Sequence, residues 1–219
     1  MCGRYELHTQ PAAMALAFGL KYPPDITARY NIAPTQQVPI IRLNANGERE
    51  LSQVKWGLVP FWAKDASIGS KMINARAETV TTAPAFRSAF KKTRCLIPAS
   101  GFYEWQKRDD GTKQPMHIGM KHGEPFAFAG LWTTWGPKDG ELVTCTIITG
   151  EPNELAAAIH NRMPVILASD DYSHWLDIEN PDAAALLRPY PADAMTAYPV
   201  STRVNSPKND DAEILVPVE

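Results

Sequence analysis

The sequence predicts an α+β fold in which a mainly antiparallel, curved or barrel-like β-sheet is flanked by short helices. Turn-forming dipeptides repeatedly separate strand-like runs, and Asn-Gly and Asp-Gly pairs readily adopt the positive φ angles of tight β-turns. These dipeptides are Asn46-Gly47, Asp110-Gly111, His122-Gly123 and Asp139-Gly140. The close spacing of the runs favours antiparallel pairing. The 219 residues contain no repeat, low-complexity segment or linker, so we expect one domain over residues 1–219.

The expected strands and helices follow from these runs and from their flanking residues. Pro84 lies near the start of one expected helix, Asn153 can cap another, and Asn180-Pro181 is a suitable N-cap and N1 pair for a third. The expected strands are 37–43, 50–59, 94–106, 114–120, 125–135, 141–149, 163–168 and 195–201. The expected helices are an Ala-rich stretch over 11–20 and the segments 83–92, 154–160 and 182–188.

Composition narrows the functional classes. The net charge of −2 excludes a global basic field, so any nucleic acid must bind a local patch. Cysteines at positions 2, 95 and 145 have no metal-ligand spacing, and their odd number favours a reducing compartment. We see no signal peptide and no apolar run of membrane-spanning length. We therefore expect a soluble, cytoplasmic protein without a membrane partner.

Cys2 carries the most chemical information. Methionine aminopeptidases remove Met1 when a small residue follows, so we expect Cys2 to be the mature N-terminus. It would then carry an α-amine, whose pKa is about 7.7–8.0 against about 10.4 for lysine, beside a thiol. The amine can attack a carbonyl and the thiol can close on the resulting imine, a step made effectively unimolecular by proximity. An aldehyde would give a five-membered thiazolidine. Cysteine at position 2 also occurs by chance, so this residue alone predicts little.

Two segments place polar residues where a plain β-core does not require them. Asn74 offers donors and an acceptor, and Arg76 offers a fork that matches phosphate. A strand-end turn with an exposed ion pair explains the same residues. Glu104 follows an apolar strand and is flanked by Tyr103 and Trp105, a setting that suits proton transfer. Ordinary strand alternation explains Glu104 equally well.

Three further features are compatible with nucleic-acid chemistry. His160 lies at an expected helix end beside Asn161 and Arg162, where it is either an acid/base group or a helix C-cap. The aromatic run 56–62 can stack on bases or pack in the core, and core packing is the expected fate of Trp56. Residues 79–103 contain four basic residues and no acid, whereas 170–182 is acidic, which allows a local basic face.

In this order, the segments resemble the SOS-response-associated peptidase (SRAP) family of abasic-site processing proteins. Each motif is modest, but the ordered combination is specific and spans nearly the whole chain. The matching segments are MCGR at 1–4, YNIAP at 30–34, WGLVPFW at 56–62, INARAET at 73–79, RCLIPASGFYEW at 94–105, TIITGEPN at 146–153, IHNRMPVIL at 159–167 and the tail over 204–217. The resemblance implies an SRAP-like version of the α+β fold.

The resemblance also implies a function. Family members recognise abasic sites in single-stranded DNA, and the terminal cysteine condenses with the abasic aldehyde to form a thiazolidine crosslink. Cys2 would be the nucleophile, Asn74 would orient the sugar or the amine, Glu104 would assist ring opening and proton transfer, and His160 would act as acid/base. Lyase activity and autocatalytic removal of Met1 are further implied activities.

The implied DNA-binding residues fall into two groups. Arg4, Arg76 and Arg162 would hold phosphates, with Thr149 near the cleft. Residues that would contact DNA or block a continuing duplex are Asn31, Pro34, Phe61 and Trp62. This chain has Phe61-Trp62 where the family often has paired tryptophans, so its stacking surface is smaller. The implied partners are single-stranded DNA with abasic sites and replication-fork proteins. We expect a monomer without metal or cofactor, associated with the nucleoid when bound to DNA.

Two other functions remain open from the sequence. Glutamine amidotransferases also begin Met-Cys-Gly and use the terminal amine as base for the thiolate. Here, however, the chain turns polar at Arg4, and we see no synthase domain. A non-catalytic single-strand-binding module would use the aromatic residues and arginines alone, and its binding would be indifferent to an abasic site.

Overall fold

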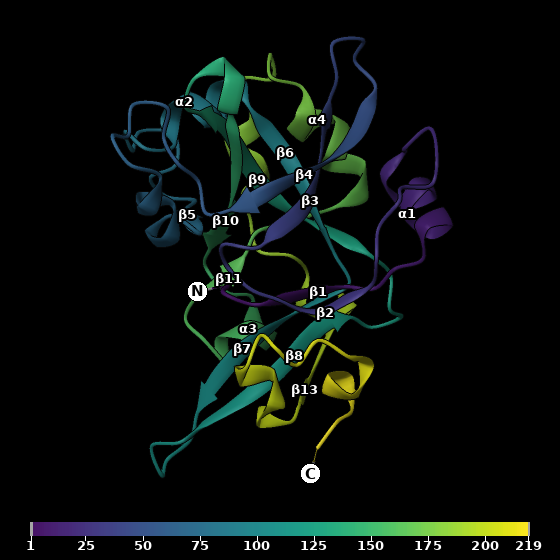
Figure 1. Cartoon of the computed structure of the whole chain (residues 1–219). Coiled ribbons are helices and arrows are strands. Elements are labelled where there is room, and N and C mark those ends of the chain that lie inside the picture. The colour runs from purple at the N-terminus through teal and green to yellow at the C-terminus, as the bar shows by residue number, and fades with distance from the viewer. Residues whose placement is uncertain (1, 219) are drawn as a thin grey trace.

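A five-stranded β-barrel forms the upper body of the molecule in Figure 1, a computed structural model that describes residues 2–218. Its strands run in the order β10-β4-β3-β6-β9, and β9 pairs back onto β10 to close the ring. The pairings are antiparallel except that of β4 with β10, which is parallel. The strands are β3 (Gln37–Leu43), β4 (Arg49–Trp56), β6 (Arg94–Ala99), β9 (Phe126–Trp135) and β10 (Leu142–Gly150). The barrel confirms the predicted fold class.

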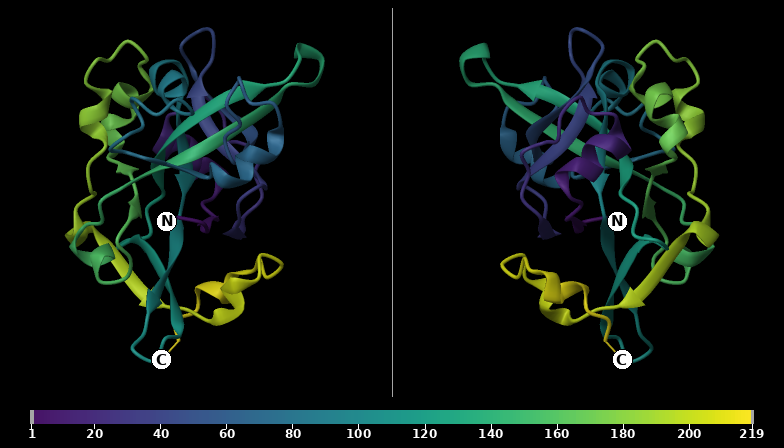
Figure 2. Two further views of the ribbon diagram at one scale, coloured as in Figure 1. Left: turned by 90° about the vertical axis from the view of Figure 1, so that its left-hand side faces the viewer. Right: turned by 90° about the vertical axis from the view of Figure 1, so that its right-hand side faces the viewer.

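A second, antiparallel sheet lies below the barrel (Figures 1 and 2). Its order is β13-β8-β7-β1-β2, so the first strand of the chain pairs in its interior. The C-terminal segment, yellow in Figure 2, folds across the same end of the molecule. The strands are β1 (Tyr5–Leu7), β2 (Arg29–Ile32), β7 (Gly101–Lys107), β8 (Lys113–Met120) and β13 (Met195–Pro199).

The chain crosses from the barrel to the second sheet at Ser100. We predicted one strand over 94–106, and the structure corrects this to β6 and β7. Between them, the Ser100 N–H donates to the Glu6 carbonyl at 2.9 Å, and the Ser100 hydroxyl accepts from the His8 N–H at 3.1 Å. The sequence pattern over 94–106 does not reveal that its two halves pair with strands of different sheets.

Three short strands extend the barrel near its lower rim. β5 (Asn74–Arg76) runs parallel to β10, β11 (Met163–Pro164) pairs with β10, and β12 (Ile166–Leu167) pairs with β9. The strand predicted over 163–168 is thus split, and β1, β2 and β5 were not predicted. Segments of two to four residues are too short to produce a period-2 pattern.

Four short α-helices surround the sheets: α1 (Pro11–Phe18), α2 (Arg87–Lys92), α3 (Glu154–Ala157) and α4 (Tyr172–Leu176). The first three lie within predicted segments, and the Asn153 side chain caps α3 as expected by accepting from the Ala156 N–H at 2.9 Å. The predicted helix over 182–188 is wrong, because only a 3₁₀ helix, Ala183–Leu186, forms there. Pro189 follows directly and disfavours helical geometry at Arg188.

Aromatic side chains connect the barrel to β1. Tyr5 and Trp56 are fully buried, with ring centroids 5.4 Å apart, and Tyr5 lies 5.7 Å from Phe128. The Trp56 indole donates to the Ile73 carbonyl at 2.8 Å, which confirms its predicted place in the core. Core packing therefore fixes the segment that directly follows Cys2. Within residues 2–218, the helices all lack the length and hydropathy that crossing a membrane would require.

A buried carboxyl group supports β1 from its other face. Glu6 is 1% exposed, and its Oε1 lies 2.9 Å from Nε2 of His117, which is also buried. Its Oε2 lies 3.2 Å from Nε2 of His8, an ion-pair distance without hydrogen-bond alignment. Burial alone would raise the pKa of Glu6, but the contacts with His117 and His8 lower it below its usual 4.5. The contact with the Glu6 carboxylate raises the pKa of His8 above 6.5.

We expect this cluster to give the fold a stability maximum in mildly acidic solution. The contribution of Glu6 is present above pH 4.5 and is lost as the pH falls through its lowered pKa. The contribution of His8 is present below pH 6.5 and is lost as the pH rises through its raised pKa. Melting temperatures of the wild type and Glu6→Gln, measured from pH 3 to 9, check this. Melting temperatures that change with pH in the same way in both proteins would contradict this expectation.

Candidate active site

Cys2 lies in the core just before β1 and is fully buried. Desolvation raises the pKa of its thiol far above 9, and the Glu104 carboxylate raises it further, while a hydrogen bond from the Arg4 N–H only partly offsets this. The thiol is therefore protonated at neutral pH. Such a group is a poor first nucleophile, but it retains a proton that it can deliver in a later step.

Glu104 is brought to Cys2 by the pairing of β1 with β7. Tyr5 is opposite Phe102, and the Tyr103 N–H donates to the Arg4 carbonyl at 3.0 Å, so β7 continues alongside the N-terminal end. Glu104 is 4% exposed and interacts electrostatically with Cys2. A buried carboxyl beside a protonated thiol can accept and return a proton.

Asn74 lies on β5, opposite Ile147 of β10. Its Nδ2 donates to the Ile73 carbonyl at 3.0 Å. Its Oδ1 is buried and accepts no hydrogen bond from residues 2–218. A buried acceptor without a donor is costly in a folded protein. This oxygen is therefore available to a donor that arrives with a substrate.

His160 and Arg162 lie on the turn after α3. The His160 Nδ1 accepts the Arg162 N–H at 3.0 Å, which orients the imidazole. The Gln106 Nε2 of β7 donates to the Ala158 carbonyl at 2.9 Å and ties this turn to the strand that carries Glu104. In Figure 1 the N-terminal end, β5, β10 and β11 occupy one side of the molecule. Strand β7 thus links Cys2 and Glu104 to the turn that carries His160, while Asn74 lies on β5 beside β10.

The arginine of this turn is held against β10. The Arg162 Nη2 donates to the Thr149 carbonyl at 2.5 Å, and the guanidinium also pairs with Glu78. Thr149 is opposite Arg76 on β5 and opposite Pro164 on β11. The end of β10 therefore organises two predicted phosphate-binding arginines and the threonine between them.

The predicted DNA-binding residues differ widely in exposure. Phe61 and Trp62 are 69% and 50% exposed on the loop after β4, and Arg76 is also exposed. Trp62 is steadied by a long hydrogen bond, 3.4 Å, from its indole to the Pro84 carbonyl. These three side chains are therefore accessible from solvent. Half-buried side chains in the predicted set are Arg4, Pro34 and Arg162.

Asn31 is fully buried, and its contacts are with the C-terminal segment. Its Nδ2 donates to the carbonyls of Val204, Ser206 and Asn209, while its Oδ1 accepts from the Arg4 Nη1 at 2.8 Å. Thr149 is likewise only 1% exposed. Their role in DNA binding stays a prediction, and in the free protein both side chains support neighbouring segments.

Three supporting residues were not predicted from the sequence. Asp210 accepts from the N–H groups of Tyr30 and Asn31 and pairs with Arg29, which secures the C-terminal segment. The Val204 carbonyl accepts from the Arg4 Nη1 at 2.6 Å, and the Asn205 Oδ1 accepts from the Trp105 indole at 2.8 Å. The match of 204–217 to the family tail was the available signal. It does not show which segments the tail contacts.

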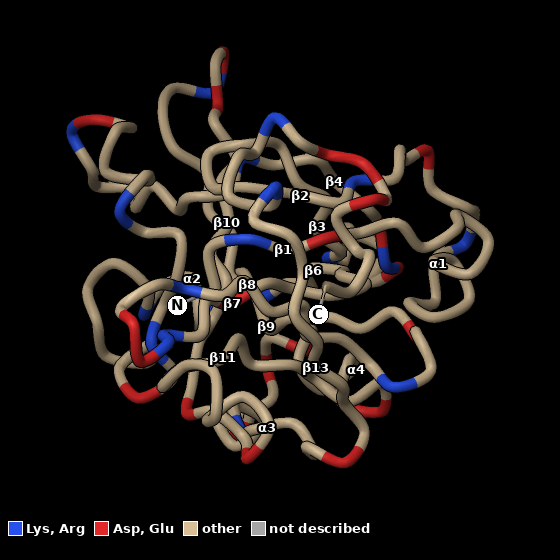
Figure 3. Tube along the Cα trace, turned by 90° about the horizontal axis from the view of Figure 1, so that it is seen from below, with Lys and Arg blue, Asp and Glu red and all other residues tan. Residues whose placement is uncertain are grey.

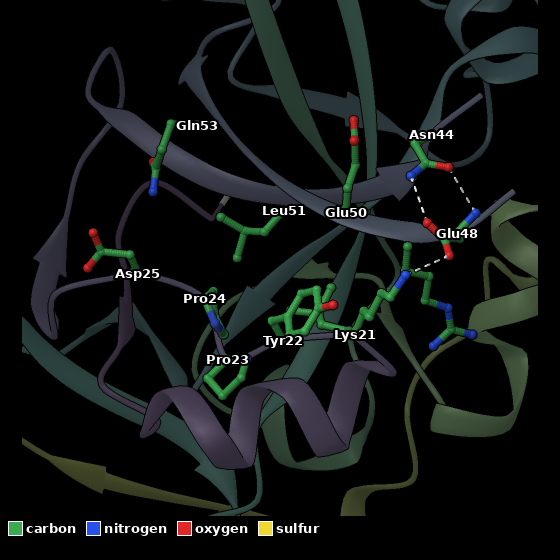
Figure 4. Close-up of a pocket in the computed structure, with 12 residues that line it drawn as sticks. Lys21, Tyr22, Pro23, Pro24, Asp25, Asn44, Glu48, Glu50, Leu51 and Gln53 are labelled. Carbon is green, nitrogen blue, oxygen red and sulfur yellow. Dashed lines mark hydrogen bonds and ion pairs between the residues drawn. The ribbon is translucent and has the colours of Figure 1, made fainter. Parts of the chain in front are cut away.

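The charges are unevenly distributed over the surface, and one surface hollow lies away from the predicted site residues. In Figure 3 several Lys and Arg positions gather around the N-terminal end, and acidic positions dominate the edge near α3. A hollow of about 600 Å³ lies between residues 20–25 and the β3–β4 hairpin, where Lys21 contacts Glu48 at 3.6 Å (Figure 4). It contains none of the predicted site residues. Among residues 2–218 no group of three His, Cys, Asp or Glu side chains is arranged for a metal ion.

Comparison with known proteins agrees with this arrangement. The family model "SOS response associated peptidase (SRAP)" matches residues 1–207. Abasic site processing protein YoaM of Bacillus subtilis is 49% identical, over 98% of this chain and 97% of its own. Abasic site processing protein HMCES of Gallus gallus is 36% identical, over 87% of this chain and 66% of its own.

A solved structure extends the comparison to the fold. A crystal structure of a protein from Bacteroides thetaiotaomicron superposes with a TM-score of 0.85 at 28% identity, and the whole length of both chains is covered. The family match and the closely similar relatives cover nearly all of the residues that form the two sheets and the site. The chain therefore belongs to the SOS response associated peptidase (SRAP) family.

Proposed function

We propose that this protein processes abasic sites in single-stranded DNA by forming a covalent bond through Cys2 once Met1 has been removed. The observation that carries the proposal is the placement of a buried, protonated Cys2 thiol beside the Glu104 carboxyl. The names of the relatives, abasic site processing proteins, supply the substrate class. Met1 itself lies outside the described residues.

The proposed reaction starts at the α-amine of Cys2. Its lone pair attacks the aldehyde carbon of the open-ring abasic sugar, and the carbinolamine loses water to give an imine. The Cys2 sulfur then adds to the imine carbon while the thiol proton passes to the imine nitrogen. The product is a thiazolidine, and one water is released overall. A neutral thiol suits this order, because it reacts only after the imine has formed beside it.

Three further residues have roles in this scheme. Glu104 takes a proton from the sugar hydroxyl as the ring opens and returns it when water leaves. His160 exchanges protons during imine formation and reversal, and the same chemistry allows β-elimination, the proposed lyase activity. The free Asn74 Oδ1 accepts a hydrogen bond from the sugar or the amine. Autocatalytic removal of Met1 by these groups belongs to the same proposal.

DNA binding in the proposal uses the exposed side chains. Phe61 and Trp62 stack on bases at the end of a strand, and Arg76, Arg162 and Arg4 hold phosphates. The relatives are named abasic site processing proteins, which favours an abasic site over an amide as the substrate. Amide hydrolysis therefore ranks below abasic-site chemistry.

The direct test mixes purified protein with a single-stranded oligonucleotide that contains one abasic site and measures the intact mass. We expect the mass of the chain without Met1 plus the oligonucleotide minus one water. The absence of an adduct on a chain that has correctly lost Met1 would refute the proposal. An equal affinity for intact and abasic strands, without an adduct, would favour the non-catalytic binding module.

We expect Glu104→Gln to slow adduct formation by about 10²-fold or more, because the amide keeps the shape of the carboxyl but does not transfer protons. Single-turnover rates on abasic DNA measure this, with Glu141→Gln, an exposed position remote from the site, as the matched control. An unchanged rate in Glu104→Gln would exclude Glu104 from proton transfer.

A further inference from the structure

Glu78 occupies the anion-binding side of Arg162. The Arg162 Nη1 donates to the Glu78 Oε1, and its Nη2 donates to the Glu78 Oε2 at 3.0 Å. Two parallel N–H···O bonds are the arrangement in which a guanidinium binds either a carboxylate or a phosphate. The carboxylate therefore fills the position that a DNA phosphate would take.

The two partners are held very differently. The Arg162 side chain is 19% exposed and stays anchored by its hydrogen bond to the Thr149 carbonyl at 2.5 Å. The Glu78 side chain is 47% exposed on the turn after β5. An exposed carboxylate loses little when it turns into solvent, because such ion pairs contribute only about 0–1 kcal/mol. Glu78 is thus the exchangeable partner and Arg162 the fixed one.

We propose that Glu78 is an internal phosphate mimic that competes with a DNA phosphate for Arg162 and thereby weakens the binding of single-stranded DNA. This inference rests on the proposed function, since it concerns the same binding surface. Without DNA, Glu78 neutralises Arg162 and keeps its guanidinium ordered. On binding, a phosphate replaces the carboxylate on the same two nitrogens. This competition selects against intact strands, because they form no covalent bond with the protein.

The test compares wild type with Glu78→Gln by fluorescence anisotropy, using a short intact single-stranded oligonucleotide at several salt concentrations. We expect Glu78→Gln to bind about two- to fivefold more tightly, the range that an exposed ion pair supplies. We also expect the plot of log affinity against log salt to steepen by up to about 0.7, as one further phosphate is neutralised without release of an internal anion.

Three variants separate competition from a general charge effect. Glu151→Gln removes the same charge from an exposed carboxyl two residues beyond Thr149. Arg162→Gln and the double variant Glu78→Gln/Arg162→Gln complete the cycle. We expect no comparable gain in Glu151→Gln, and we expect the gain of Glu78→Gln to vanish in the Arg162→Gln background. A gain that persists there, or an equal gain in Glu151→Gln, would overturn the inference.

The remaining outcomes distinguish this inference from the proposed function. Weaker binding by Glu78→Gln would show that Glu78 positions Arg162 instead of competing for it, which also overturns the inference. Crosslinking of abasic DNA without any gain in Glu78→Gln would overturn the inference alone. The expected gain in a protein that never crosslinks abasic DNA would overturn the proposed function alone.

Discussion

We expect Cys2→Ala to abolish the stable adduct with abasic DNA completely. Alanine keeps the α-amine, and its small size still permits Met1 removal, but it has no sulfur to close the thiazolidine ring. An imine alone hydrolyses readily. Intact mass after incubation with an abasic oligonucleotide measures the loss. Cys145→Ala is the matched control, because Cys145 is an equally buried thiol in the barrel and we expect its variant to crosslink fully.

The same variant reports the order of the chemical steps. If the amine attacks first, borohydride added during the reaction should trap the imine of Cys2→Ala as a reduced, stable adduct. A stable adduct in Cys2→Ala without borohydride would mean that another group is the nucleophile. Failure of borohydride to trap any adduct would place the thiol before the amine, despite its raised pKa.

The second large effect concerns folding: we expect Gly57→Ala to lower the free energy of unfolding by about 3–5 kcal/mol. Gly57 has φ +131°, and an added Cβ would lie 2.6 Å from the backbone oxygen of Gly69. The collision involves backbone on both sides, so no side chain can rotate away. Urea denaturation measures the loss.

Substitutions at two other glycines separate the loss caused by backbone strain from the loss caused by the steric clash. Gly47 has φ +77° with no atom near its added Cβ, so Gly47→Ala should lose only the backbone part, about 1–2 kcal/mol. Gly140 has an ordinary φ and open space, so Gly140→Ala should be nearly neutral. Equal losses at all three positions would show that the approach of Gly57 to Gly69 is unimportant. Because Gly57 begins the segment that ends in Phe61-Trp62, Gly57→Ala should also weaken DNA binding.

Local patterns in the sequence were sufficient for much of the fold. The long strands β3, β4, β8, β9 and β10 form where turn dipeptides bound apolar runs, because a hairpin brings neighbouring segments together without distant information. Asn153 caps α3 for the same local reason. Residues whose neighbours in sequence supply their partners were therefore predictable.

Contacts between distant segments were not predictable in this way. Nothing local indicates that β1 pairs with β7, that the run over 94–106 divides at Ser100, or that Asn31 binds carbonyls near the C-terminus. Such pairings depend on the whole packed structure and leave no periodic signal in short segments.

By itself, the sequence determined the types of chemical group at the candidate site: a cysteine at position 2, a carboxyl at 104, an imidazole at 160 and forked cations at 76 and 162. Only the tertiary structure decided their states. Burial keeps the Cys2 thiol protonated, and the fold brings Glu78 into contact with Arg162, which lies 84 residues further along the chain. The physical reason is that residue type sets which bonds a group can form, while desolvation and long-range contacts determine which of them it does form.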